Sequence, residues 1–146
     1  MKRRKPAWKP VWPDIKTGHW KGEMVGSCTV SFGQDVQPGP PRQSIEFTYM
    51  VIPAIFTMPE AQYDWPGIIM IMVPTPMKTE FPDAGRLIKG DGILSLLLSL
   101  EVTRGQFTDM LGMIERKRLK EFRFTTDEQD DDCWSVKSWG MTTTFS

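Results

Sequence analysis

Apolar and polar residues alternate along two segments in the first third of the chain. From Met24 to Phe32, the even positions hold Met, Gly, Cys, Val and Phe, whereas three of the four odd positions hold Ser or Thr. From Ile45 to Val51, the apolar residues Ile, Phe, Tyr and Val occupy the odd positions. A period of two is typical of a strand with one buried face. The sequence therefore predicts strands over 24–32 and 45–51, and Pro53 is expected to end the second strand or to place it at a sheet edge.

Two further segments are apolar enough to be buried strands. Residues 67–73, GIIMIMV, have no polar face, so this strand is expected between two layers or under another chain. In residues 92–102, GILSLLLSLEV, leucines occupy the even positions from 94 to 100, with Ser95 and Ser99 on the opposite face. The flanking glycine and the alternating serines favour a strand over a helix.

One amphipathic helix is predicted near residues 104–117. Thr103 and Gln106 have the spacing of a capping box, in which each side chain binds a free backbone amide of the first turn. Apolar residues follow at positions 107, 110, 111 and 114, which form a single stripe on a helix.

The last part of the chain predicts two strands joined by an acidic loop. A strand within 119–126 leads to the run DEQDDD at 127–132, which is expected to be a solvated turn, and the final strand begins at residue 133. A bulge near Ser138 would bring four apolar residues of unlike parity to one face: Trp134, Val136, Trp139 and Met141. Six strands and one helix predict an α+β domain, mainly antiparallel, built as a sandwich or rolled sheet.

The first 23 residues differ in composition from the rest. They hold seven Lys or Arg and two acidic residues, so their local charge is seven minus two, +5. Prolines at positions 6, 10 and 13 exclude a helix and favour extended backbone. We therefore expect a basic, Trp- and Pro-rich N-terminal arm over 1–23 and a single compact β-rich domain over 24–146.

Composition narrows the classes of partner and compartment. The 146 residues include 18 basic and 18 acidic side chains, so the molecule as a whole exerts no long-range attraction on nucleic acids or anionic membranes. The longest apolar stretches fall short of the roughly 20 residues that a membrane-spanning helix needs. The basic start, MKRRK, is followed by Pro and Trp where a secretory signal would have an apolar core. A cytoplasmic protein with two reduced thiols, Cys28 and Cys133, is expected.

No catalytic or metal-binding motif emerges from the sequence. His19 is the single histidine and has no partner at local spacing, and a zinc site needs three or four ligands. The glycine-bounded segment 85–92, GRLIKGDG, lacks the Lys-Ser/Thr that a phosphate loop requires. The acidic run lacks the spaced ligands and glycine of a calcium loop. We therefore expect no cofactor and no metal. A small enzyme is the third hypothesis for the function, because folding can bring two carboxylates together for acid–base catalysis.

The N-terminal arm and the acidic run are the candidate binding segments, because Trp and Arg are enriched at binding hot spots and opposite charges attract. For Trp12 and Trp20, which lie nearest the first predicted strand, packing against the chain's own domain is the alternative. The favoured function is a non-catalytic protein-interaction module, an accessory subunit or an inhibitor that occludes a partner's surface, of a size that suits a phage or mobile element. The alternative is a nucleic-acid-binding accessory protein that uses the arm. A homo-oligomer in which the arm of one copy meets the acidic run of another is also considered. The candidate partner-binding residues are Lys2, Arg3, Arg4, Lys5, Trp8, Trp12, Asp130, Asp131 and Asp132.

Overall fold

The chain is mostly β-structure. The computed structural model describes residues 15–59, 61, 63–74, 84–90, 94–116 and 121–142. Within these residues it contains eight strands and one helix: β1 (Gly18–Met24), β2 (Thr29–Gln37), β3 (Gln43–Thr57), β4 (Trp65–Met72), β5 (Gly85–Lys89), β6 (Leu96–Glu101), α1 (Arg104–Glu115), β7 (Glu121–Asp130) and β8 (Cys133–Thr142).

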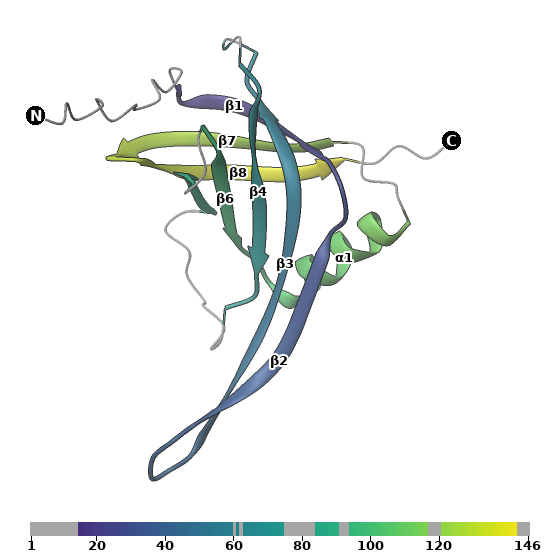
Figure 1. Cartoon of the computed structure of the whole chain (residues 1–146), viewed down its shortest axis with the longest axis vertical. Helices are drawn as coiled ribbons and strands as arrows, with labels where there is room; N and C mark the ends of the chain where they lie inside the picture. The colour runs from purple at the N-terminus through teal and green to yellow at the C-terminus, as the bar shows by residue number, and fades with distance from the viewer. Residues whose placement is uncertain are drawn as a thin grey trace, which may run out of the picture.

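Seven of these strands close into a barrel. They are hydrogen-bonded in the order β1-β7-β8-β5-β6-β4-β3, and β3 pairs back with β1. All neighbours are antiparallel except β4 and β6. In Figure 1, β1, β7 and β8 run across β3, β4 and β6, so the barrel has two walls whose strands cross. The predicted α+β fold with a six-stranded sandwich or rolled sheet is therefore wrong, because β1 has a neighbour on each side and leaves the barrel without an open edge.

Strands β1 and β2 lie one after the other along the same edge of β3. Lys21 to Met24 pair with Thr57 to Ala54, and β2 then pairs with β3 from Thr29, opposite Val51. Residues 25–28 make the changeover, where Gly26 has a positive φ of 99°. The single strand predicted over 24–32 is therefore wrong, because the changeover divides it. Residues 18–23, which the prolines led us to assign to the arm, form most of β1.

Pro53 lies inside β3, not at its end. Its carbonyl accepts a hydrogen bond from the amide of Val25, 2.9 Å away, in the changeover. The backbone nitrogen and carbonyl of a residue in an antiparallel strand face the same neighbour. The missing N–H of Pro53 would thus point at the changeover between β1 and β2, where the ladder along this edge of β3 is already interrupted. Because proline removes no further ladder hydrogen bond there, β3 continues to Thr57.

The core fills the barrel with the inward-facing residues of each strand. Met50, Ile52, Ala54 and Phe56 of β3 are at most 1% exposed. The stripe of α1 joins the same core through Phe107, Met110 and Ile114, with Leu111 partly buried against it. Both capping-box hydrogen bonds are present. The Thr103 amide donates to the Gln106 side-chain oxygen at 2.9 Å, and the Gln106 amide donates to the Thr103 hydroxyl oxygen at 3.1 Å. The predicted helix is confirmed over 104–115, and residue 117 lies outside the described residues.

The last two strands contain the predicted bulge. Thr125 is opposite Ser138, but the next residue, Thr126, is opposite Val136, so Lys137 is the extra residue. Trp134 and Val136 are buried, and Trp139 and Met141 are partly buried and pack against the same core. The acidic run is not the loop we predicted. Strand β7 extends through most of it to Asp130, because exposed charged side chains are compatible with backbone pairing at the end of a hairpin. Only a two-residue turn remains before β8.

No helix in the described part of the chain has the length and apolar character needed to cross a membrane.

Candidate protein-interaction surfaces

Six of the predicted partner-binding residues lie outside the described residues: Lys2, Arg3, Arg4, Lys5, Trp8 and Trp12. Trp20, the third tryptophan of the predicted arm, is 1% exposed in the barrel core. Its ring centroid lies 5.1 Å from that of Trp65 and 6.0 Å from that of Phe124. Its indole N–H donates to the carbonyl of Lys16 at 3.2 Å. The role of Trp20 is therefore packing.

The three predicted acidic residues surround the β7–β8 turn. Asp130, Asp131 and Asp132 are exposed, and Asp131 has a positive φ of 51°. Asp132 forms an ion pair with Lys89 at 3.2 Å, which links the turn to β5. Two of the three carboxylates, those of Asp130 and Asp131, have no ion pair among the described residues.

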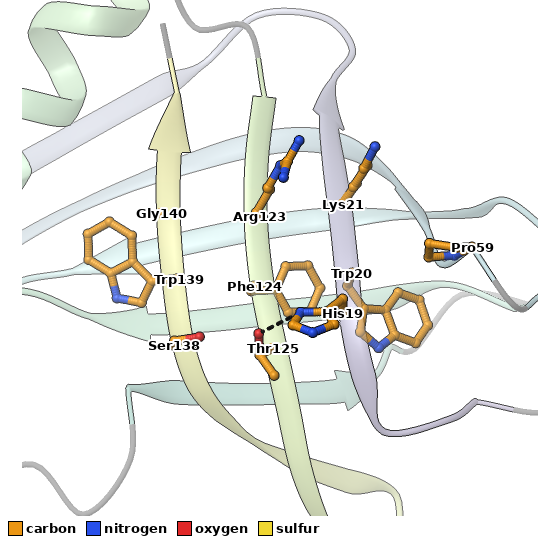
Figure 2. Close-up of a pocket in the computed structure, with 10 residues that line it drawn as sticks. All are labelled: His19, Trp20, Lys21, Pro59, Arg123, Phe124, Thr125, Ser138, Trp139 and Gly140. Carbon is orange, nitrogen blue, oxygen red and sulfur yellow. Dashed lines mark hydrogen bonds between the residues drawn. The ribbon is translucent and has the colours of Figure 1, made fainter.

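A groove of about 280 Å³ lies on the outer face of β1, β7 and β8. Figure 2 shows its polar lining, in which His19 and Lys21 come from β1 and Arg123 and Thr125 come from β7. His19 is exposed, and its Nδ1 lies 3.3 Å from the Thr125 hydroxyl. As the structure describes it, the lining contains no Asp or Glu.

The two cations of this groove share one carboxylate just outside the lining. Glu121 is ion-paired with Lys21 at 3.2 Å and with Arg123 at 2.5 Å. The hydrogen bond from Arg123, together with a weaker one from Lys21, holds the pKa of the Glu121 carboxyl below its ordinary value. Together these three groups carry one net positive charge, so the groove suits an anionic or hydrogen-bonding group. It suits acid–base chemistry less well, because His19 has no carboxylate partner among the described residues. The described residues also hold no group of three or more metal-ligating side chains.

The opposite wall of the barrel has an apolar outer surface. On β3, β4, β5 and β6 the residues that alternate with the core point outward, and nine of them are apolar. We call these nine residues the outer apolar face: Val51, Pro53, Ile55, Pro66, Ile68, Met70, Met72, Ile88 and Leu97.

Register places these nine side chains next to one another. Ile68 is opposite Pro53 on one side and Leu97 on the other, and Met70 is opposite Val51. Ile68 is 42% exposed although it lies in the middle of a sheet. The groove wall presents His, Lys, Arg, Thr and Ser at the corresponding outward positions, so the two walls differ in chemistry.

The β2–β3 hairpin is a second exposed apolar region. It projects beyond the barrel, as Figure 1 shows. Phe32 and Val36 of β2 are 79% and 59% exposed. Phe32 is on the face of the hairpin that continues into the core, and the sequence predicts it as inward-facing. It is exposed because the barrel ends before β2 does.

Sequence reasoning did not identify these two regions as sites, although one signal was present. The absence of a polar face in residues 67–73 predicted a strand under a second layer or another chain, and Ile68 and Met70 belong to it. Phe32 gives no such signal, because its alternation matches a half-buried strand. Comparison of the chain with protein-family models, curated proteins and solved structures found no match.

Proposed function

We propose that this protein is a non-catalytic protein-interaction module, an accessory subunit or an inhibitor, that docks a partner protein on the outer apolar face. The single observation that carries the proposal is a nine-residue apolar surface on one wall of the barrel, with Ile68 at 42% exposure at its centre. Monomeric proteins rarely expose contiguous apolar patches larger than a few hundred square ångströms, and larger ones mark sites of association.

The composition of this face suits a protein partner. Three methionine and isoleucine side chains, Ile68, Met70 and Met72, follow one another along β4 at every second position. Methionine adapts its shape to a facing surface, and sheet residues hold their positions without reorganisation when they bind. Arg86 and Glu101 lie at outward positions beside the patch and supply the polar rim that interfaces usually have.

A quantitative capture experiment tests this proposal. The tagged chain is incubated with lysate of its source cells, and bound protein is compared among wild type, Ile68→Lys and Ser138→Lys. We expect Ile68→Lys to reduce capture of a stoichiometric partner at least about tenfold, because charge at the centre of an apolar interface is left unpaired. Ser138→Lys, on the groove wall, should retain the partner. A partner that Ile68→Lys retains in full, with unchanged circular dichroism, would contradict the proposal.

Binding of nucleic acid is the second candidate, and one observation favours it. The groove with Lys21 and Arg123 lies on β1 and its neighbours, immediately after the basic first segment of the chain. Affinity for a DNA or RNA fragment that falls steeply with salt and is weakened by Lys21→Ser would support this candidate. Because Glu121 already pairs with both cations, we rank it behind protein binding.

A further inference from the structure

Strand β2 has one edge that no other strand of the described residues pairs with. Within the described part of the chain it pairs with β3 alone, from Thr29 opposite Val51 to Gln37 opposite Gln43. Each barrel strand, in contrast, has a neighbour on both sides. The other edge of β2 therefore presents a row of backbone N–H and C=O groups that can pair with another strand.

Strand β2 has little of the protection that edge strands usually have. Its sequence, TVSFGQDVQ, contains no lysine and no proline, and Asp35 is its only charge. Natural edge strands discourage pairing with charged side chains, prolines or bulges, and β2 is paired with β3 over nine consecutive residues without a register shift. The two most exposed large apolar side chains of the described residues, Phe32 and Val36, are both on this strand.

The spacing of Phe32 and Val36 is self-complementary. The two residues are four positions apart, so they share one face of the strand and are symmetric about Gln34. In an antiparallel pair of β2 strands with a two-fold axis at Gln34, Phe32 of each copy is opposite Val36 of the other. Asp35 is then opposite Gly33, so the two carboxylates do not meet directly. Cross-strand aromatic and β-branched pairs of this kind stabilise a sheet.

We propose that two copies of this chain associate through antiparallel pairing of their β2 strands about Gln34. The partner is a second copy because the strand is complementary to itself, and an interface between identical patches is the commonest route to a closed dimer. The dimer forms one continuous sheet through both hairpins. It uses an edge that the outer apolar face does not include, and it is independent of the proposed function. Strand pairing alone is a small interface, so association is expected in the micromolar range.

Sedimentation of the full chain under reducing conditions tests the dimer. We expect the wild type to dimerise at micromolar concentrations, and Phe32→Lys or Val36→Lys to weaken association roughly a hundredfold, because each substitution occurs twice in the dimer. Ser44→Lys, on the same face of the hairpin but on β3, is the matched control and should dimerise like the wild type. The double variant Phe32→Lys/Val36→Glu places opposite charges across the two-fold pairing and should associate at least about tenfold more tightly than Phe32→Lys.

A wild-type chain that remains monomeric at about a hundred times the expected dissociation constant would overturn the proposal. So would a dimer that both lysine variants retain, and a double variant no tighter than Phe32→Lys would overturn the register. The results of the dimer test can be distinguished from those of the partner-capture test of the proposed function. Ile68→Lys should leave the dimer intact, whereas loss of both partner capture and dimerisation in Phe32→Lys alone would assign both events to β2.

Discussion

Replacing Trp20 by alanine tests whether β1 closes the barrel. The side chain is 1% exposed and packs against the rings of Trp65 and Phe124. Truncation of a buried tryptophan or phenylalanine to alanine costs about 3–5 kcal/mol, because both the transfer energy and the contacts around the new cavity are lost. The 3.2 Å hydrogen bond to the Lys16 carbonyl is lost as well.

This loss is a large part of the total, since domains of this size are stable by about 5–15 kcal/mol. At about 2–4 °C per kcal/mol, the thermal midpoint of Trp20→Ala should fall by about 6–20 °C. Urea unfolding followed by circular dichroism measures the free energy directly. Trp139→Ala is the control, because Trp139 is only partly buried and stacks on one ring, that of Phe122, at 6.1 Å.

We expect Trp139→Ala to lose clearly less stability than Trp20→Ala. Should Trp20→Ala prove too unstable to purify, Trp20→Phe keeps an aromatic ring in the core and should fold with an intermediate loss. The reasoning is refuted if Trp20→Ala unfolds within about 1 kcal/mol of the wild type, which is the ordinary range for a residue that does not fill a core.

Three further predictions follow from single positions. A Cβ at Gly67 would collide with the backbone oxygen of Leu96, so Gly67→Ala should lower the free energy of unfolding by at least about 1–3 kcal/mol. Gly112 lies in α1 with open space around it, so Gly112→Ala should raise the free energy of unfolding by about 0.5–1 kcal/mol. Urea midpoints of the two variants that fail to move in opposite directions would contradict this. Thr103→Ala removes the acceptor of the capping box and should cost about 1 kcal/mol in the same assay, whereas Thr108→Ala, also on the exposed side of α1, should cost less. The pKa of Glu121 is lower in the folded than in the unfolded chain. The stability that this carboxylate contributes is therefore present above the unfolded pKa and is lost as pH falls through the folded pKa. The free energy of unfolding of Glu121→Gln should accordingly depend less on pH in the acidic range than that of the wild type.

Local signals in the sequence were sufficient for several elements. The capping box at Thr103 and the stripe from Phe107 to Ile114 predicted α1, because both depend on residues within one or two turns of each other. The bulge beside Ser138 was predictable because only an extra residue brings Trp134 and Trp139 to the same core. These features are determined by neighbours in the chain.

The closure of the barrel depends on distant pairings that no local pattern reports. The alternation around Trp20 was short and followed three prolines, so nothing in it indicated that β1 pairs with both β3 and β7. Nor does the pattern around Phe32 show where the barrel ends, which decides whether that side chain is buried or 79% exposed. Of the candidate site, only the doubly apolar segment that contains Ile68 was visible, because a missing polar face is a property of the segment itself.

The pairing of β1 with β7 has a consequence for the order of events during synthesis. Gly18 pairs with Thr126, so β1, the first strand of the described residues, completes its contacts only with β7, the seventh. Between Met24 and Glu121 lie 96 residues, which take roughly 5–20 s to translate. During that interval β1 can pair with β3, but Trp20 has no Phe124 to stack on and the wall of the barrel stays open. Closure is therefore a late, long-range step, and the nascent chain exposes apolar core surface to chaperones and to other chains until β7 arrives.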